Sequence, residues 1–531
     1  MKKFILLFVL VALLLCGCKS DDKPVVVEDE VDQAKVNEVV DSISFLYDDI
    51  DNIHINEEET RNEIARIRTL YDELNEKEKA LIENYSALEE LEALVKKYND
   101  EQEEKKMAEQ KKQEAVEAAY NMLDEKIAKY YEDDFDLPRT FEYDETTKVY
   151  ISWNTSDPNT ISTLGVVTRP RVNNAGVTLT ATISCGSVTK EFKRSIKIPF
   201  LSFEKLPSTP VFAYFFLDQS SLTEVEASTI DVVNLSFGNI TTDGSVTVGG
   251  LAYNKLLKER DKGIRIMFSV QNKTGFKTYT KTAALREQLV DNFISTMTTY
   301  HFDGIDIDWE YPEGDEVANY TEFMKLLYTK VKALSRDYLV TTAVYGGNGQ
   351  SHYNVPETQK YVDYMHLMTY DLNAPEQTSH VTSLSGKTSV VSTVAAYNNS
   401  GVPYSKLVIG AAFYGKKYKL PEGSTSFYGV NCDEGAVTIK YKDIKSTYLS
   451  KLDSSDNIKR VWDSSAQAPY LCITNENGNN YFITYDDVES VTLKAEYVLE
   501  NKLAGIMFWD LGEEDRTTND LVGAIKSVIK K

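Results

Sequence analysis

Three acidic side chains recur at every second position of one short segment of the chain: Asp306, Asp308 and Glu310. Apolar residues fill the positions between them. A period of two is typical of a β-strand, in which the three carboxyls share one face and lie about 6 to 7 Å apart along it. Carboxyls buried this close together cannot all ionise, because burial and mutual repulsion raise the pKa of at least one of them. A carboxyl that stays protonated near neutral pH is the proton donor that a leaving glycosidic oxygen requires.

Glu310 is the last of the three and therefore nearest to the carboxyl end of the predicted strand, so we assign it as the proton donor. Calcium binding is the main alternative, since Asp-x-Asp-x-Glu spacing also suits hard cations. An EF-hand loop, however, has a glycine at its sixth position and a glutamate at its twelfth, whereas this segment has a strand pattern. No Cys-x-x-Cys or His-rich spacing indicates another metal. The sequence predicts neither a metal nor a cofactor.

The strand that carries these acids belongs to a series of short apolar runs with helical patterns between them, as parallel strands covered by helices would have. The eight runs are Val211–Phe216, Val232–Phe237, Ile264–Ser269, Gly304–Trp309, Leu339–Tyr345, Tyr364–Tyr370, Leu407–Phe413 and Gly505–Trp509. They predict an α/β fold, a (β/α)₈ TIM barrel over residues 208–531. In that fold the chemistry lies at the carboxyl ends of the strands, where Glu310 is expected.

Two further segments precede the predicted barrel. Residues 36–130 are rich in Glu, Lys, Leu and Ala at helical spacing and predict a helical spacer, in which Asn75 and Glu78 form a capping box that opens a second helix. Residues 131–200 have strand patterns and resemble bacterial immunoglobulin-like domains, which implies a small β-sandwich with Trp153 in its core. We expect this domain also to act as a spacer.

The N-terminus has the layout of a secretory signal: two lysines, an apolar run too short to span a bilayer, and then Leu15-Cys16-Gly17-Cys18. This ending resembles the bacterial lipobox. The resemblance implies that residues 1–18 hold the signal, that Cys18 carries the lipid and that residues 19–35 form a tether. We therefore expect an extracytoplasmic protein held at a bacterial cell surface by a lipid anchor in the membrane. An ordinary signal peptide with chance cysteines is the alternative.

Charge and cysteine content exclude some classes of protein. The formal net charge is −24, from 82 acidic and 58 basic residues, and this argues against a nucleic-acid partner, because phosphate binding needs a clustered positive field. Beyond the predicted signal the cysteines are Cys185, Cys432 and Cys472, which indicates no disulfide framework. Pairing of Cys432 with Cys472 is left open by the sequence.

The acidic segment also resembles a known family. Its residues Asp303, Asp306, Asp308 and Glu310 reproduce the Asp-x-x-Asp-x-Asp-x-Glu signature of family 18 glycoside hydrolases, and Gly304, Trp309, Tyr311 and Pro312 extend the likeness towards the chitinase branch. The similarity continues along the chain in the segments 367–372, 406–415, 482–498 and 504–511. The resemblance thus spans the whole predicted barrel.

The resemblance implies a substrate-assisted, retaining mechanism, in which the acetamido oxygen of the substrate attacks the anomeric carbon. Glu310 would protonate the leaving oxygen and then act as the base for water, Asp308 would orient the acetamido N–H with support from Asp306, and Tyr370 would hydrogen-bond the acetamido carbonyl. The implied substrate-binding residues are Trp509 as an apolar floor, Asp371, Met368, Tyr214 and Tyr311. Asp303 and Gly304 are implied to be structural.

Two positions depart from the family pattern. The chain has Ser269-Val270-Gln271-Asn272 where the family often has Ser-x-Gly-Gly-Trp, and Gly415-Lys416 where Gly-Arg is usual. The expected function is hydrolysis of β-1,4-linked N-acetylglucosamine polymers, either chitin or chitooligosaccharides. An endo-β-N-acetylglucosaminidase that acts on N-glycan cores and a non-catalytic sugar-binding surface protein are the alternatives.

Overall fold

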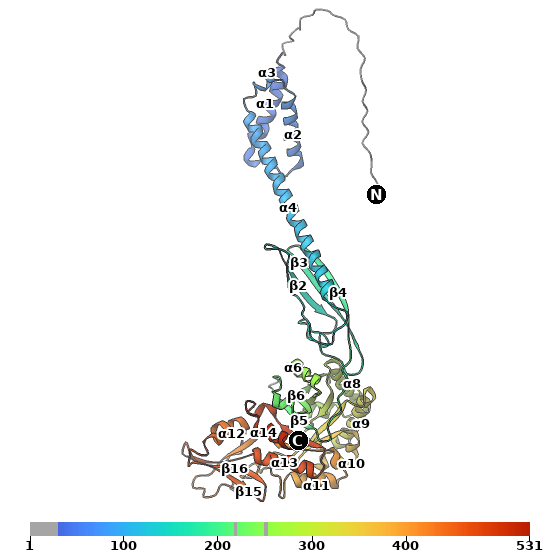
Figure 1. Cartoon of the computed structure of the whole chain (residues 1–531), viewed down its shortest axis with the longest axis vertical. Coiled ribbons are helices and arrows are strands. Elements are labelled where there is room, and N and C mark those ends of the chain that lie inside the picture. Colours follow the sequence, from blue (N-terminus) through green and yellow to red (C-terminus); the bar gives the residue numbers. More distant parts are fainter. Residues whose placement is uncertain (1–29, 217–219, 249–252) are drawn as a thin grey trace, which may run out of the picture. The chain divides into compact units, whose positions relative to one another are not determined.

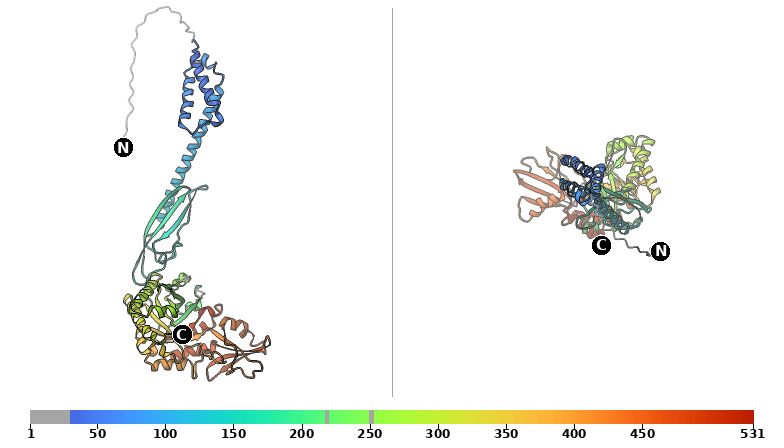
Figure 2. Two further views of the ribbon diagram at one scale, coloured as in Figure 1. Left: turned by 180° about the vertical axis from the view of Figure 1, so that it is seen from behind. Right: turned by 90° about the horizontal axis from the view of Figure 1, so that it is seen from above.

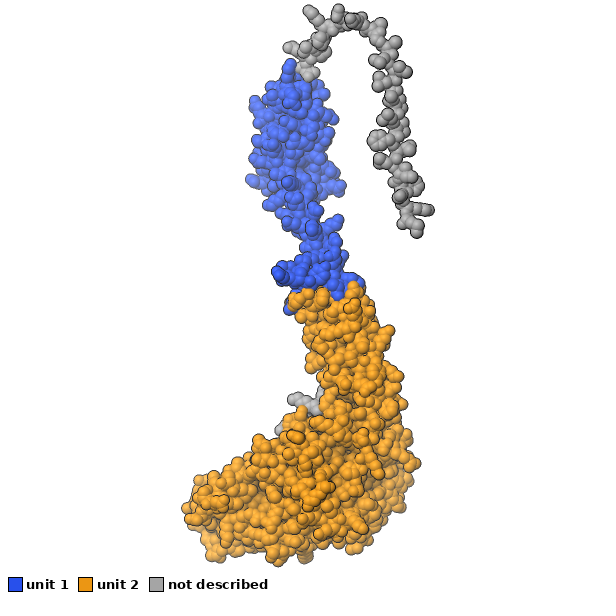
Figure 3. Space-filling view, viewed as in Figure 1, with its two compact units in different colours: residues 1–118, 143–148, 185–188 blue, residues 119–142, 149–184, 189–531 orange. Residues whose placement is uncertain are grey.

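The computed structural model describes residues 30–216, 220–248 and 253–531. The predicted signal, Cys18 and residues 19–29 of the tether lie outside these ranges. The described residues divide into two compact units (Figure 3): the first holds those up to Ala118 with Tyr143–Lys148 and Cys185–Val188, and the second holds the other described residues. Within the described ranges, no helix has both the length and the apolar character needed to cross a membrane.

The first unit is a small helical bundle (Figure 1). Its helices are α1 (Gln33–Tyr47), α2 (Glu58–Asp72), α3 (Glu76–Lys79) and the first part of α4 (Tyr85–Lys126). Their shared core contains Ile43, Ile67, Leu88 and Leu91, each of which is fully buried.

The expected capping box forms, because the Asn75 side chain accepts from the backbone N–H of Glu78 and the Glu78 carboxylate accepts from that of Asn75. The second helix expected to open at this capping box is interrupted after one turn, however, since α3 ends at Lys79 and α4 begins only at Tyr85. Between them, the Asn84 amide donates to the Val40 carbonyl and the Ser44 hydroxyl on α1. These contacts favour a turn over a continuous helix.

The second unit begins with a four-stranded antiparallel sheet in the order β1 (Thr140–Glu142), β2 (Lys148–Thr155), β3 (Ala175–Cys185) and β4 (Val188–Ile198). Trp153 is buried as predicted, and its indole N–H donates to the Pro138 carbonyl at 2.8 Å. The layer that packs on this sheet is not the second sheet that a β-sandwich would have. It contains the end of helix α4, whose Tyr120 ring meets Phe192 edge-on at 5.6 Å.

Eight parallel strands follow and close into the predicted barrel, with β5 paired to both β6 and β18. In chain order they are β5 (Val211–Phe216), β6 (Val232–Ile240), β8 (Arg265–Val270), β9 (Gly304–Ile307), β10 (Leu339–Tyr345), β11 (Tyr364–Met368), β12 (Leu407–Ala412) and β18 (Gly505–Trp509). The short strand β7 (Val246–Thr247) pairs with the end of β6. The helices between the barrel strands are α5 (Glu224–Ala227), α6 (Tyr253–Leu257), α7 (Lys273–Tyr279), α8 (Ala283–Thr299), α9 (Glu316–Leu334), α10 (Val355–Thr358), α11 (Val390–Asn399) and α13 (Val488–Glu500), and α14 (Asp520–Ile529) follows β18.

A second, five-stranded antiparallel sheet lies between β12 and β18 in the chain, and no pattern in the sequence predicted it. Its order is β14 (Val437–Lys440), β13 (Tyr414–Lys419), β17 (Asn479–Tyr485), β16 (Ala468–Glu476) and β15 (Ile458–Asp463), with helix α12 (Tyr441–Thr447) inserted. The sheet forms a lobe beside the barrel (Figure 2). Cys432 and Cys472, whose pairing was open, are both free thiols in this region.

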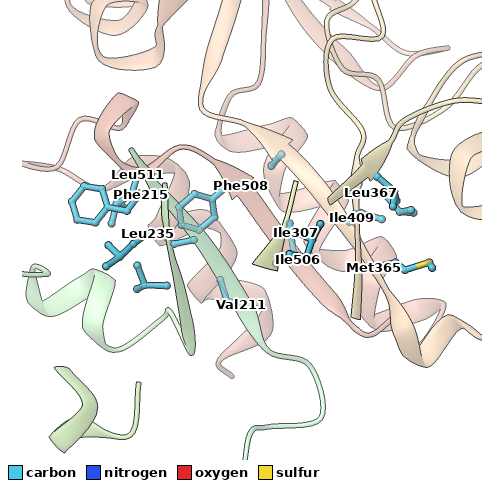
Figure 4. Packing of buried hydrophobic residues seen from close by; sticks show 14 of the residues in the cluster. Val211, Phe215, Leu235, Ile307, Met365, Leu367, Ile409, Ile506, Phe508 and Leu511 are labelled. Carbon is cyan, nitrogen blue, oxygen red and sulfur yellow. The ribbon is translucent and has the colours of Figure 1, made fainter. Parts of the chain in front are cut away.

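The barrel wall has two faces, as the period-two pattern predicts. Alternate residues of the strands point outward into an apolar core shared with the helices, among them Ile307, Ile409 and Ile506 (Figure 4). Trp309 belongs to this outer set and stacks on Phe276 at 5.3 Å. Strand β9 ends at Ile307, earlier than predicted, so Asp308 and Glu310 lie just beyond its carboxyl end.

Candidate active site

A pocket of about 850 Å³ opens at the carboxyl ends of the barrel strands. A cavity of this size is within the usual range for ligand sites. The predicted residues that line it are Tyr214, Asp308, Glu310, Tyr311, Met368, Tyr370, Asp371 and Trp509. Asp303, Gly304 and Asp306 are buried and do not line the pocket. The structure thus brings the predicted substrate-binding residues together and places the predicted supporting residues behind them.

Asp306 is fixed by hydroxyl donors inside the barrel. Its Oδ2 accepts from Tyr214 at 2.9 Å and from Ser269 at 2.7 Å, and its Oδ1 accepts from Thr341 at 2.5 Å. The Tyr214 hydroxyl also meets His366 Nδ1 at 2.9 Å. Burial lowers the pKa of His366 to about 4, against an opposing effect of Asp306, so the ring is neutral at neutral pH. Since Tyr214 donates to Asp306, the neutral ring carries its proton on Nδ1 and donates to Tyr214.

Asp308 and Glu310 form a hydrogen-bonded carboxyl pair at the base of the pocket. Burial raises the pKa of Asp308 well above its usual value, and the adjacent Glu310 charge adds to this effect. The surroundings of Asp308 therefore favour its protonated form, beside Glu310. Asp308 Oδ1 is buried and has no hydrogen-bond partner among the described residues, so a ligand donor would find an acceptor there.

Glu310 is half-buried and receives two further contacts. Its Oε1 accepts from the Gln271 amide at 2.6 Å, and the Tyr311 hydroxyl also hydrogen-bonds its carboxyl. Gln271 is one of the positions at which the sequence departs from the family pattern. These contacts hold the Glu310 carboxyl at the pocket surface.

Tyr370 packs against the inner wall through a contact that requires glycine at position 410. A Cβ atom on Gly410 would lie 2.7 Å from Tyr370 Cε1 and 2.8 Å from the Met507 methyl group. The Tyr370 hydroxyl lies 3.9 Å from the Met507 sulfur, and burial raises the pKa of Tyr370 well above its usual value. The side chain therefore enters the pocket as a protonated hydroxyl, able to donate to a ligand oxygen.

Trp509 ends strand β18 and forms one apolar wall of the pocket. Its ring stacks on Phe237 at 5.4 Å and lies 5.7 Å from the Tyr214 ring, and it remains half-exposed. The same pocket is lined by Asp371, which forms an ion pair with Lys416 at 3.0 Å and also hydrogen-bonds Tyr414. A sugar ring has apolar faces of C–H groups and polar hydroxyls around its edge. A site that binds it therefore needs an apolar surface beside charged groups, as this pocket has.

Asp303 is buried just before strand β9 and is held by two arginines. Its carboxylate accepts from Arg171 at 2.7 and 3.1 Å, from Arg260 at 3.2 Å and from the Ile266 N–H at 2.8 Å. Burial alone would raise the pKa of Asp303, but the two guanidinium groups hold it below its usual value. A Cβ on the next residue, Gly304, would lie 2.4 Å from the Leu339 carbonyl oxygen, so only glycine fits there. These contacts agree with a structural role for both residues.

Several residues around the site were not predicted from the sequence as site residues. Gln271 contacts Glu310, His366 extends the hydrogen bonds of Asp306, and Tyr345 and His352 line the pocket. A signal existed for Tyr345 and His366, because both fall on the inward-facing positions of their predicted strands. None existed for Arg171, which lies 132 residues from Asp303.

Comparisons with known proteins agree with this geometry. The sequence model of Glycosyl hydrolases family 18 matches residues 211–514, more than half of the chain, and that of the atrophied bacterial Ig domain matches residues 110–199. Chitinase B from Serratia marcescens is 27% identical over 58% of this chain and 77% of its own length. Chitinase A1 from Niallia circulans is also 27% identical, and the match covers 54% of this chain but only 46% of that protein, so the chain spans about half of that relative.

A solved structure gives the same result. A family 18 N-acetylglucosaminidase from Paenibacillus barengoltzii is 27% identical, with a TM-score of 0.54 over 60% of this chain and 99% of its own. The match to the atrophied Ig domain begins within α4, which agrees with the packing of that helix on the sheet. The family match, the relatives and the closed barrel show that this chain is a glycosidase that belongs to glycosyl hydrolase family 18.

Proposed function

We propose that this glycosidase cleaves β-1,4-linked N-acetylglucosamine polymers, chitin or chitooligosaccharides, with retention of configuration at the anomeric carbon. The observation that carries the proposal is the Asp308 Oδ1 atom, which is buried beside Glu310 and has no partner among the described residues. The N–H of a 2-acetamido group is the donor that this oxygen lacks. A sugar without that group would leave the buried oxygen unpaired, at a cost of about 1 to 3 kcal/mol.

In the first step the substrate supplies the nucleophile. Its acetamido oxygen bonds to the anomeric carbon as the bond to the leaving oxygen breaks, and Glu310 transfers a proton to that oxygen. The proton that burial holds on Asp308 passes to Glu310 for this step, across the hydrogen bond between them. Asp308 is then a carboxylate and stabilises the positive charge of the oxazolinium ring, while Asp306 supports it from behind.

In the second step water attacks the anomeric carbon and gives its proton to Glu310, and the oxazolinium ring opens to restore the acetamido group. Two displacements at the same carbon retain its configuration. Tyr370 donates to the acetamido oxygen and Trp509 supports the apolar face of the same sugar, with Asp371 at its polar edge. Met368, Tyr214 and Tyr311 also line the pocket.

The named relatives support this substrate class. Two of them are chitinases, and the aligned solved structure is an N-acetylglucosaminidase, so all three names refer to N-acetylglucosamine or its polymer. None of these names refers to an N-glycan. We therefore favour chitin-type substrates over an N-glycan core.

The test is an assay of the purified protein on chitotetraose beside a high-mannose glycopeptide, with Asp308→Asn as a matched variant. We expect cleavage of chitotetraose and the β-anomer as the first product by NMR. In Asp308→Asn the turnover should slow by about 100-fold or more, as is typical when a group that stabilises transition-state charge is removed. Cleavage confined to the glycopeptide would overturn the substrate. An α-anomer as the first product would overturn the mechanism.

We propose also that Cys18 carries a lipid that anchors the protein to a bacterial membrane at the cell surface. The lipobox-like run Leu15-Cys16-Gly17-Cys18 at the end of the apolar segment supports this. Cys18→Ser in the full-length chain should release the protein into the medium, whereas Cys16→Ser should not. Retention of the Cys18→Ser protein in the membrane fraction would contradict the anchor.

A further inference from the structure

Tyr345 is the last residue of strand β10, and its ring lies at the pocket. Thr341 points into the barrel, because its hydroxyl donates to Asp306, and Thr342 points outward to Tyr320. Counting by two from Thr341 places Ala343 and Tyr345 on the inner face, and both line the pocket. Tyr345 is 42% exposed, which is unusual for a tyrosine at the end of a buried strand. Its ring is therefore available to a ligand.

The backbone of Tyr345 is held on both sides. Its N–H donates to the Tyr353 hydroxyl at 3.2 Å, and its carbonyl accepts from the Tyr397 hydroxyl at 2.9 Å. Tyr353 and Tyr397 are themselves fully buried. The following loop closes onto the side chain at Gly349, where a Cβ would lie 2.4 Å from Tyr345 Cβ. A ring held in this way loses little conformational freedom when a ligand binds.

Tyr345 belongs to a cluster of aromatic rings that adjoins the catalytic acid. The Tyr311 ring meets it edge-on at 4.9 Å, and His352 lies 6.0 Å from Tyr345 and 5.6 Å from Tyr311. The Tyr311 hydroxyl hydrogen-bonds Glu310. Tyr311 therefore connects the cluster to Glu310, and the three rings lie on the same side of the pocket as this carboxyl.

Trp509 lies in a different sector of the pocket from Tyr345. It ends β18, and strands β12 and β11 lie between β18 and β10, which carries Tyr345. With the attacked sugar on Trp509, a sugar beyond Glu310 meets the cluster around Tyr345. The chain has Gln271-Asn272-Lys273 where the family often has Gly-Gly-Trp, so no tryptophan directly follows strand β8 to contact that sugar.

We propose that Tyr345, supported by Tyr311 and His352, is the stacking surface for the sugar on the leaving-group side of Glu310 and a determinant of specificity for substrates that extend to that side. The ligand is the apolar face of a pyranose ring. The proposal rests on the glycosidase function proposed above. It adds that binding on this side depends on one ring that the family signature does not include.

The test compares two substrates in the purified full-length protein. Chitotetraose places a sugar on the leaving side, whereas chitobiosyl fluoride has a single fluorine there and nothing to stack. In Tyr345→Ala we expect the KM for chitotetraose to rise about tenfold, the size of one lost aromatic contact, and kcat/KM for the fluoride to stay within about twofold. Tyr345→Phe keeps the ring and should behave as the wild type. Tyr404, which is 40% exposed and does not line the pocket, gives the control variant Tyr404→Ala.

Each other outcome has a distinct meaning. Equal losses on both substrates in Tyr345→Ala would show that the residue only supports the fold of the site, and unchanged kinetics on both would show that it does not contact the leaving sugar. Either result overturns the proposal. A wild-type protein that cleaves neither substrate would instead refute the function proposed above.

Discussion

The guanidinium of Arg171 and the carboxylate of Asp303 form an ion pair that is almost completely shielded from solvent, with side chains 2% and 0% exposed. Arg171 belongs to the immunoglobulin-like domain, whereas Asp303 directly precedes the strand that carries Asp306. Arg171 also donates to the Ser202 carbonyl at 2.9 Å. The immunoglobulin-like domain, which we expected to be a spacer, therefore supplies a partner to the first acid of the catalytic signature.

Loss of this pair should destabilise the protein. In Arg171→Met the Asp303 carboxylate stays buried and loses one of the two arginines that donate to it, and breaking a buried pair costs about 3 to 5 kcal/mol. The free energy of unfolding, measured with urea and tryptophan fluorescence, should fall by this order. Lys193→Met, which breaks an exposed pair with Glu191, should change it little. An unfolding curve of Arg171→Met that coincides with the wild type would contradict the structural role of the pair.

The contact between Gly410 and Tyr370 makes a prediction about activity. In Gly410→Ala the new methyl group would lie within 2.9 Å of Tyr370, Met507 and Leu367, so the Tyr370 ring must move from its place in the pocket. We expect kcat on chitotetraose to fall at least about tenfold, since small displacements of a positioning group are costly. Gly523→Ala is the control, because its methyl group would meet no atom within 4 Å. Wild-type kcat in Gly410→Ala would show that Tyr370 need not occupy this position.

The burial of His366 leads to a prediction of how the free energy of unfolding depends on pH. Burial lowers its pKa from 6.5 to about 4, so folding favours the neutral ring. The neutral ring contributes its full stability above pH 6.5, and this contribution is lost as the pH falls towards 4. Between pH 7.5 and pH 4.5, His366→Gln should lose less unfolding free energy than the wild type, by on the order of 2 kcal/mol. Equal losses in urea unfolding at the two pH values would contradict a neutral, buried His366.

Much of the barrel was predictable because its signal is local. Each predicted strand overlaps an observed one, and the alternation around Asp306 correctly gave the residues that face inward and outward. Strand β9 was predicted too long, since the apolar Trp309 continues the pattern past Ile307 although strand pairing ends there. A period of two in the sequence shows which residues share a face of a strand, but it does not show where the hydrogen bonding between neighbouring strands ends.

The features that were missed depend on distant contacts. Arg171 pairs with a residue 132 positions away, and nothing near it in the sequence indicates a partner. The β13–β17 sheet is partly exposed, and in β15 the alternation is weak, so its strands lack a clear pattern. The raised pKa of Asp308 in particular could not be predicted, for a similar reason, because the burial that causes it arises only in the closed barrel.

The role of Glu310 as the proton donor is tested most directly by Glu310→Gln, which keeps the shape of the side chain but cannot take up and transfer a proton. We expect kcat on chitotetraose to fall by about 10²- to 10⁴-fold, the usual contribution of a general acid, with the Kd for chitotetraose nearly unchanged. Glu313→Gln, at an exposed carboxylate three residues away, should retain full activity. Hydrolysis by Glu310→Gln at the wild-type rate would contradict the account.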